Sequence, residues 1–376
     1  MAVYKLFPYK DTSLYSMYST MNTGIDPINQ VSNLNFAVNS SPSVARSLIN
    51  FDNTELQDVL NNKVTGTWDA ELKSFIATAQ GIVEDSIIEV FPIYNSWNQG
   101  TGTYLDQPIT TDGACWDSPL FGGGNACDIG GSVLGYTSSY NAVYAPQGGG
   151  SWYISSSDGS TVYPATQSFG PRTDKDLNVT ITSMVEDWFS GSLPNNGVII
   201  KWENNAEFNT NKQVQPVMQY YSVDTNTIYP PELEFRWDDS IWATSSTIPV
   251  LNQPNCFVSL AENPGVFLSE SINRFRLNVR PKYPKVVFAT SSLYTKQHYL
   301  PSGSSLYAVK DLDTDEYVID FDSQYTKLSA DTTSSYFDIY MNGLEPERYY
   351  KVLIQATAGG STTIYDDNYY FKVSNG

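Results

Sequence analysis

Alternating hydrophobic and polar residues predict β-strands along most of the chain. The clearest cases are SNLNFAV (residues 32–38) and ARSLINFD (residues 45–52). Such alternation is typical of half-buried strands, because successive side chains point to opposite faces of a sheet. Runs rich in β-branched and aromatic residues predict further strands at residues 3–9 and within residues 86–100. The pattern therefore favours an all-β protein.

A helical period occurs within LNVTITSMVEDWFSGSLPNNGVIIKW, residues 177–202. Its apolar stripe consists of Ile181, Met184, Val185 and Trp188. This spacing predicts a short helix over residues 181–189, with Thr180 as its N-cap and Gly191 ending it. We expect the helix to close one end of a β-sandwich, with Trp188 in the core.

Three other segments carry weaker signals. NTELQDVLNN predicts a helical turn or a short helix, whereas WDAELKSFIATA fits a helix or a strand. Residues 100–150 contain many Gly and Ser residues and little periodicity. Loops of this length usually have a function or contact a partner.

Several motifs in order resemble a DNRLRE-type domain. TDKDLNVTITSMVEDWFSGSLPNNGVIIK resembles its closing half, and five further stretches match in the family's order: ARSLINFD, AELKSFIAT, VFPIYNSWNQGTGTYLD, DGACWD and PPELEFRW. The namesake motif itself is absent. The resemblance implies a jelly-roll-like β-sandwich with one short helix, which we assign to residues 1–242.

A second signature lies in LEPERYYKVLIQAT, residues 344–357. It matches the L-x-P-x-x-x-Y-x-V-x-I-x-A spacing of a fibronectin-III-like strand, in which the hydroxyl of Tyr350 would bond back to the backbone as a tyrosine corner. The Ser-, Thr- and Pro-rich WATSSTIPVLNQPN marks a boundary near residues 240–250. We therefore expect an Ig/fibronectin-III-like β-sandwich over residues 243–376.

Composition and charge argue against several classes of function. The 376 residues carry a formal net charge of −19 with scattered Lys and Arg, which argues against nucleic-acid binding. No apolar run is long enough to span a membrane. The start, MAVYKLFPYKDTSLYS, lacks the apolar run of a signal peptide, so we expect assembly in a cytoplasm.

Candidate chemistry is sparse, and we predict no enzyme and no cofactor. The one histidine, His298, would have to serve any triad, and a surface histidine is the better interpretation. Adjacent acids are typical of solvated turns, although they could bind a cation or act in a glycosidase; they are Glu84–Asp85, Asp238–Asp239 and Asp366–Asp367. DLDTDE, residues 311–316, resembles part of a calcium loop but lacks its Gly and distant Glu, so we expect a hairpin turn.

The three cysteines, Cys115, Cys127 and Cys256, form no zinc-binding pattern. Cys115 and Cys127 flank a glycine-rich loop and could pair in an oxidising environment, whereas a cytoplasm would keep them reduced.

Three tryptophans, Trp97, Trp116 and Trp152, lie in or beside the glycine-rich loops. Exposed aromatic rings could stack on sugars or contact a partner. The resembled family also has Trp at the positions of Trp97 and Trp116, which favours packing in the core or anchoring of a loop.

Two functions fit these observations. The first is a structural component of a tailed-bacteriophage virion, associated with the tail, baseplate or neck and docked to other virion proteins in an oligomeric assembly. The resemblance implies this function and a virion location after assembly in the host cytoplasm. The alternative is a carbohydrate-binding or adhesion module that recognises a cell-surface glycan.

Overall fold

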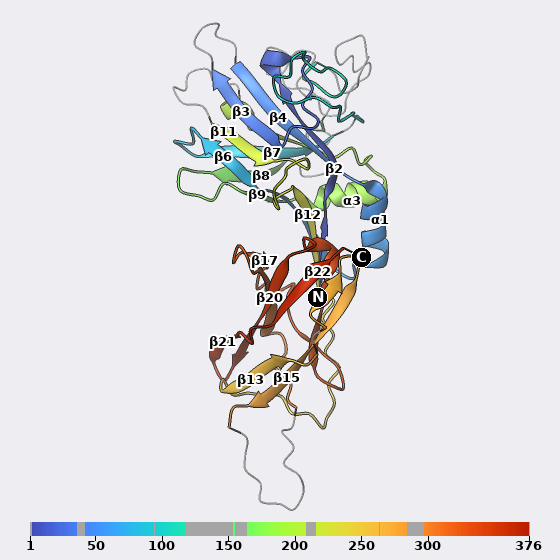
Figure 1. Cartoon of the computed structure of the whole chain (residues 1–376), viewed down its shortest axis with the longest axis vertical. Helices are drawn as coiled ribbons and strands as arrows, with labels where there is room; N and C mark the ends of the chain where they lie inside the picture. The colour runs from blue at the N-terminus through green and yellow to red at the C-terminus, as the bar shows by residue number, and fades with distance from the viewer. Residues whose placement is uncertain are drawn as a thin grey trace, which may run out of the picture. The chain divides into compact units, whose positions relative to one another are not determined.

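The described residues form two compact units, which Figure 1 shows in a computed structural model. The structure describes residues 2–35, 42–93, 95–117, 153–154, 164–207, 216–262, 264–283 and 297–375. Unit 1 consists of Met1–Lys5, Val64–Asp69 and Phe235–Gly376, and unit 2 of Leu6–Lys63 and Ala70–Glu234. Unit 1 thus includes two short segments from the N-terminal part of the chain. The expected division into residues 1–242 and 243–376 stays a prediction.

Unit 2 contains an eight-stranded sheet with the order β6-β11-β3-β4-β10-β7-β8, and β2 pairs with β4. The strands are β2 (Pro8–Tyr15), β3 (Ile28–Asn35), β4 (Pro42–Phe51), β6 (Ile76–Gln80), β7 (Ser86–Pro92), β8 (Ala165–Phe169), β10 (Val198–Trp202) and β11 (Val217–Tyr221). At its centre β10 is antiparallel to β4, with Ile199 opposite Leu48. Every residue of β10 is buried. A strand buried on both faces explains the nearly continuous apolar run VIIKW.

A four-stranded sheet has the order β1-β12-β5-β9. Its strands are β1 (Ala2–Leu6), β5 (Trp68–Ser74), β9 (Leu177–Thr180) and β12 (Glu232–Trp237). The unit boundaries fall inside three of these strands, after Lys5, after Asp69 and before Phe235. In β5, buried Ala70, Leu72 and Ser74 alternate with partly exposed residues. This alternation resolves the ambiguous WDAELKSFIATA segment into the strands β5 and β6.

The predicted helix is α3 (Thr182–Ser190), and its stripe is buried as expected. Met184, Val185 and Trp188 are 0%, 0% and 2% exposed. Gly191 ends the helix in the left-handed region at φ 76. The predicted cap is wrong, because the N-cap residue is Ile181 and no side chain caps the helix. Thr180 instead ends β9, where pairing with Glu71 of β5 keeps its backbone extended.

A second helix, α1 (Asn53–Asn62), confirms the helical interpretation of NTELQDVLNN. Its N-cap is Asp52, whose Oδ1 accepts hydrogen bonds from the N–H groups of Thr54 (2.7 Å) and Glu55 (3.0 Å). These bonds satisfy two of the N–H groups that a helix start leaves unpaired. α1 contacts α3, and the two helices lie side by side in Figure 1.

Unit 1 contains two further sheets, and together with those above they confirm an all-β sandwich fold. One has the order β13-β15-β19-β18, and the other β14-β22-β20-β16-β17 with β21 paired to β20. The strands are β13 (Cys256–Leu260), β14 (Val266–Leu268), β15 (Ile272–Pro281), β16 (Ser305–Asp311), β17 (Tyr317–Ile319), β18 (Ser329–Ala330), β19 (Ser335–Tyr340), β20 (Tyr349–Ala358), β21 (Ser361–Tyr365) and β22 (Tyr370–Ser374).

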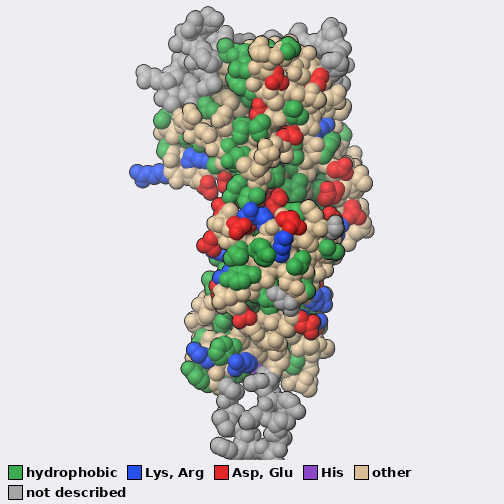
Figure 2. Space-filling view, in the orientation of Figure 1, with side chains coloured by type: hydrophobic (Ala, Val, Ile, Leu, Met, Phe, Trp, Pro, Cys, Tyr) green, Lys and Arg blue, Asp and Glu red, His purple; other side chains and the backbone are tan. Residues whose placement is uncertain are grey.

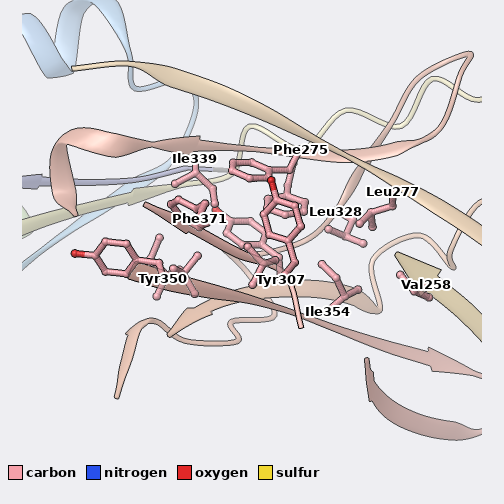
Figure 3. Close-up of a cluster of buried hydrophobic side chains, with 14 of the residues drawn as sticks. Val258, Phe275, Leu277, Tyr307, Leu328, Ile339, Tyr350, Ile354 and Phe371 are labelled. Carbon is pink, nitrogen blue, oxygen red and sulfur yellow. The ribbon is translucent and has the colours of Figure 1, made fainter. Parts of the chain in front are cut away.

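Stacked aromatic rings join these two sheets in the core that Figure 3 shows. Phe337 of β19 stacks on Phe275 of β15, with ring centroids 5.3 Å apart, and on Tyr307 of β16 at 4.5 Å. Tyr350 is buried, and its hydroxyl donates to the backbone oxygen of Glu345 at 2.9 Å. This backward bond is the one that the LEPERYYKVLIQAT motif predicts.

The DLDTDE segment forms the turn between β16 and β17, as expected. Asp311 Oδ1 accepts from the N–H groups of Asp313 (2.8 Å) and Thr314 (3.0 Å). Arg348 donates to both carboxylate oxygens of Asp311, at 2.6 and 2.7 Å. The carboxylate is therefore occupied in holding the turn.

Candidate partner-binding site

Asn22 is the centre of a hydrogen-bond network that fixes the loop formed by residues 99–114. Its Nδ2 donates to the backbone oxygens of Gln99 (2.6 Å) and Ala114 (2.9 Å). Its Oδ1 accepts from the N–H groups of Gly24 (3.1 Å) and Gly102 (2.9 Å). The side chain is 0% exposed. The side-chain amide thus donates two hydrogen bonds and accepts two, all of them to protein groups, which is its full capacity. We call residues 99–114 the Asn22 loop.

Two glycines allow the loop backbone to approach Asn22. A Cβ at Gly100, where φ is 78, would lie 2.3 Å from Asn22 Oδ1. A Cβ at Gly113 would lie 2.5 Å from Asn22 Nδ2. Side chains at either position would therefore displace the central amide.

Aspartate side chains fix the turns of the Asn22 loop. Asp112 accepts from the N–H (2.9 Å) and hydroxyl (2.6 Å) of Thr101. Asp106 accepts from the N–H (2.8 Å) and hydroxyl of Thr103. The threonine hydroxyls lower the pKa of both carboxyl groups, because hydrogen bonds stabilise the ionised form. The loop therefore keeps this bonding at neutral pH.

The Asn22 loop presents apolar side chains to solvent. Tyr104, Leu105 and Ile109 are 45%, 41% and 41% exposed. Leu105 has a φ of 60, a left-handed conformation that residues other than glycine seldom adopt. The N–H of Tyr104 donates to Asp26 Oδ2 at 2.8 Å, and its ring packs on Tyr15 with centroids 4.9 Å apart. Backbone strain of this kind is concentrated at binding sites and other functional positions.

A buried charged cluster lies on one face of the β4-β10-β7 part of the sheet. Arg46 of β4 bonds Glu207 of α4 (Asn204–Glu207) through Nε–Oε1 at 2.7 Å and Nη2–Oε2 at 2.9 Å. Lys201 Nζ lies 3.6 Å from Glu207 Oε2 and 3.1 Å from Glu89 Oε2. The Arg46, Lys201 and Glu207 side chains are 0% exposed. The positive charges of Arg46 and Lys201 are therefore balanced within the fold by two carboxylates, those of Glu89 and Glu207.

Loop residues cover this cluster. The Arg46 guanidinium lies 5.1 Å from the centre of the Trp116 ring, and Phe91 of β7 packs against Tyr153 at 4.6 Å. Arg46, Lys201 and Glu207 have no exposed surface, so a substrate cannot reach these three side chains in this structure, whereas Glu89 is 22% exposed. We therefore assign the cluster a role in fixing the sheet and loop.

The tryptophans singled out in the sequence are buried where the structure describes them. Trp97 is 1% exposed, its Nε1 donates to Asn196 O at 2.9 Å, and Lys10 Nζ lies 4.4 Å from its ring centre. Trp116 is 5% exposed. Neither ring offers a face on which a sugar could stack, and both anchor loops. Trp152 lies outside the described residues.

The candidate catalytic residues occupy ordinary structural positions. The backbone N–H of His298 donates to Val279 O at 3.0 Å. Asp238 bonds Lys327 at 2.8 Å, and Asp366 bonds Lys351. Glu84 and Asp85 are exposed. In the part of the chain that the structure describes, no three His, Cys, Asp or Glu side chains are grouped to hold a metal ion.

Two further sequence expectations concern cysteines and membranes. Cys115 is buried and Cys127 lies outside the described residues, so the expectation that a cytoplasm keeps both reduced stays untested. Within the described ranges, no helix has the length and apolar character needed to cross a membrane.

Comparisons with known proteins identify no family. No protein-family model and no curated protein matched the sequence. A solved structure, the adhesin domain of Epf from Streptococcus pyogenes, aligns over 100% of this chain and 99% of that chain, with 9% identity and a TM-score of 0.18. Similarity at this level carries no conclusion about function. The fold assignment rests on the strands and sheets themselves.

The sequence interpretation missed Asn22 and the charged cluster. A signal existed for the cluster, since Arg46 and Lys201 each interrupt a short apolar strand, and a buried charge needs a partner. No comparable signal marked Asn22, because its role depends on contacts with residues about 80 to 90 positions later.

Proposed function

We propose that the protein is a non-enzymatic structural component of a bacteriophage virion, associated with the tail, baseplate or neck. It docks to other virion proteins through the Asn22 loop and enters the particle during assembly in the host cytoplasm. The observation that carries the docking role is the fixed backbone around Asn22, which holds Tyr104, Leu105 and Ile109 outward.

Preorganisation supports this role. A flexible loop would lose conformational entropy on binding, whereas hydrogen bonds from Asn22, Asp106 and Asp112 already hold this loop in the free protein. Aromatic and aliphatic side chains at the tip supply the apolar contact that the centre of a protein interface needs.

The virion assignment is supported by the ordered DNRLRE-type motifs and by the two β-rich units. β-Sandwiches provide rigid frames that present loops at their ends. The burial of Arg46, Lys201 and Glu207 favours a framework role over catalysis for this charged cluster.

Purified particles test the assignment. We expect mass spectrometry of density-purified virions to detect the protein at a fixed ratio to the other structural proteins. Its absence from particles that are otherwise complete would refute the virion assignment.

Loop variants test the docking surface. We expect Tyr104→Ser combined with Ile109→Ser to reduce incorporation into particles by about tenfold or more, since both side chains would leave the centre of an interface. Val83→Ser is the matched control, because Val83 is an exposed apolar residue of unit 2 at 64% exposure. Equal incorporation of the loop variant and the control would show that the Asn22 loop does not dock.

A further inference from the structure

Basic side chains form a stripe on the outer face of β15 in unit 1. Phe275, Leu277 and Val279 are buried, so the alternate positions point outward. From residue 274 to residue 280 these positions carry Arg274, Arg276, Asn278 and Arg280, and Lys282 follows the strand. From Arg274 to Arg280 the stripe is about 20 Å long at the rise of a β-strand.

Aromatic rings lie under several of these cations. The guanidinium of Arg280 lies 4.5 Å from the ring centre of Phe257 on the paired strand β13. Lys282 Nζ lies 5.9 Å from the ring centre of Tyr283. Phe257 and Tyr283 are 47% and 78% exposed. Positive groups and open ring surfaces are thus presented together, and Figure 2 shows blue and green side chains next to each other at the lower end of the coloured surface.

The stripe is locally positive although the whole chain carries −19. Arg274 bonds Asp338 at 2.8 Å, and Arg276 bonds Asp331 at 2.7 Å. Among the described residues, no carboxylate forms an ion pair with Arg280 or Lys282, and both side chains are exposed. Two cations therefore remain available to an incoming anion.

We propose that this surface, the basic-aromatic strip, binds an acidic polysaccharide. It consists of Phe257, Arg274, Arg276, Arg280, Lys282 and Tyr283. A guanidinium can bond both oxygens of a carboxylate or two oxygens of a sulfate. The exposed parts of the Phe257 and Tyr283 rings offer apolar surface to the C–H side of a sugar ring beside the cations. The length of the stripe fits several linked sugars.

Charge density favours a polysaccharide over a nucleic acid. Duplex DNA carries one charge per 1.7 Å or so, so an acidic protein repels it more strongly than a polyanion of lower charge density. A uronic-acid polymer has charges several times farther apart, and charges beyond about 8 Å are largely screened at physiological salt. The ligand would therefore respond mainly to the local excess of Arg and Lys.

The two exposed rings lie at one end of the stripe, where Phe257 is next to Arg280 and Tyr283 is next to Lys282. The strip lies in unit 1 and uses none of the Asn22 loop, so this inference is independent of the docking role proposed above.

The test is binding of the full chain to alginate, a uronic-acid polymer, with neutral dextran and single-stranded DNA as comparisons. We expect alginate binding that weakens as NaCl rises from about 50 to 500 mM, since charge pairs are screened, and no binding to dextran. Alginate affinity no greater than that for dextran, or DNA affinity equal to that for alginate at the same salt, would overturn the proposal.

Two variants of equal charge change locate the site. We expect Arg280→Gln combined with Lys282→Gln to weaken alginate binding about tenfold or more, because two charge-assisted contacts are lost. Lys310→Gln combined with Lys372→Gln removes two charges from the other sheet of unit 1 and should change binding less than about twofold if only the strip is used. Equal loss in both variants would show that net charge alone drives binding.

A third variant separates the aromatic contribution from charge. We expect Phe257→Ser to weaken binding at constant net charge, with an unchanged unfolding temperature since the ring is half exposed. Unchanged alginate affinity in Phe257→Ser would remove the aromatic part of the proposed site.

Discussion

Arg46 and Glu207 form a two-pronged ion pair inside unit 2, with bonds of 2.7 and 2.9 Å and no exposure of either side chain. Lys201 shares the same carboxylate at 3.6 Å. The pair joins the central strand β4 to α4, two elements about 160 residues apart. It therefore connects distant parts of the chain through two buried charges. Removing either charge would leave the other buried without this partner.

Glu207→Gln should lower the free energy of unfolding by about 3–5 kcal/mol, because Arg46 and Lys201 would remain buried with one carboxylate fewer. Urea unfolding measures this loss. Asp338→Asn is the matched control, since its partner Arg274 is exposed and such pairs contribute at most about 1 kcal/mol. Equal losses would mean that water reaches the cluster.

Asn22→Asp should destabilise the Asn22 loop, because the two donors to Gln99 O and Ala114 O are replaced by a charged acceptor. We expect a loss of roughly 3 kcal/mol and faster hydrogen exchange of the Gly102 amide. Asn61→Asp is the control, since Asn61 lies exposed on α1 and bonds only within that helix. Unaltered exchange at Gly102 would show that other contacts hold the loop.

Gly197→Ala and Gly191→Ala should differ although both glycines have positive φ, at 84 and 76. A Cβ at Gly197 would lie 2.1 Å from the backbone oxygen of Ile49, whereas one at Gly191 would meet nothing within 4 Å. We expect a loss of about 1 kcal/mol at Gly191 from backbone strain alone. At Gly197 we expect roughly 3 kcal/mol or more. Denaturant midpoints compare the two, and similar losses would contradict the close approach.

Asp11 should make stability depend on pH near neutrality. Burial raises its pKa to about 7, even though Val223 N–H and Asn29 Nδ2 donate to Oδ2 at 2.7 Å each. The native state therefore binds the proton more tightly than the unfolded chain, whose Asp pKa is about 3.9. The stability that this proton contributes is fully present below about pH 4 and declines as the pH rises to 7. Above pH 7 the free energy of unfolding is therefore lower than at pH 4 by an amount on the order of 4 kcal/mol.

Asp11→Asn imitates the protonated carboxyl and removes this dependence. We expect its stability relative to the parent chain to rise between pH 5 and pH 8, measured by urea unfolding at both values. Asp58→Asn should show little change over this range, because hydrogen bonds from Lys63 and Asn62 hold the pKa of the exposed Asp58 below its ordinary value. A pH-independent difference for Asp11→Asn would contradict the raised pKa.

Local pattern predicted the elements whose causes are local. The stripe through Met184 and Trp188 gave α3, and the left-handed Gly191 ended it as expected. Tyr350 and its bond to Glu345 followed from a fixed spacing within one strand and its preceding turn. Thr180 failed as a cap because pairing with β5, a contact remote in sequence, determined its backbone conformation.

The candidate sites depend on contacts between residues far apart in sequence, so the local sequence pattern could not predict them. Asn22 reaches Ala114 across 92 positions, and Arg46 reaches Glu207 across 161. Position near glycines left both a contact role and a core or loop-anchor role open for Trp97; the burial of its ring and its Nε1 bond to Asn196 agree with the second, which the sequence favoured. Exposure of Tyr104 and Leu105 could be assigned only once the loop backbone was known.

The positions at which the chain passes between its units constrain how the gene could be divided. Val3 belongs to the core cluster of unit 1, far in sequence from the rest of that cluster, and Val64–Asp69 belongs to the same unit. A fragment beginning at residue 243 would lack both segments. A single recombination event therefore cannot exchange either unit intact, because each unit consists of separate segments of the chain.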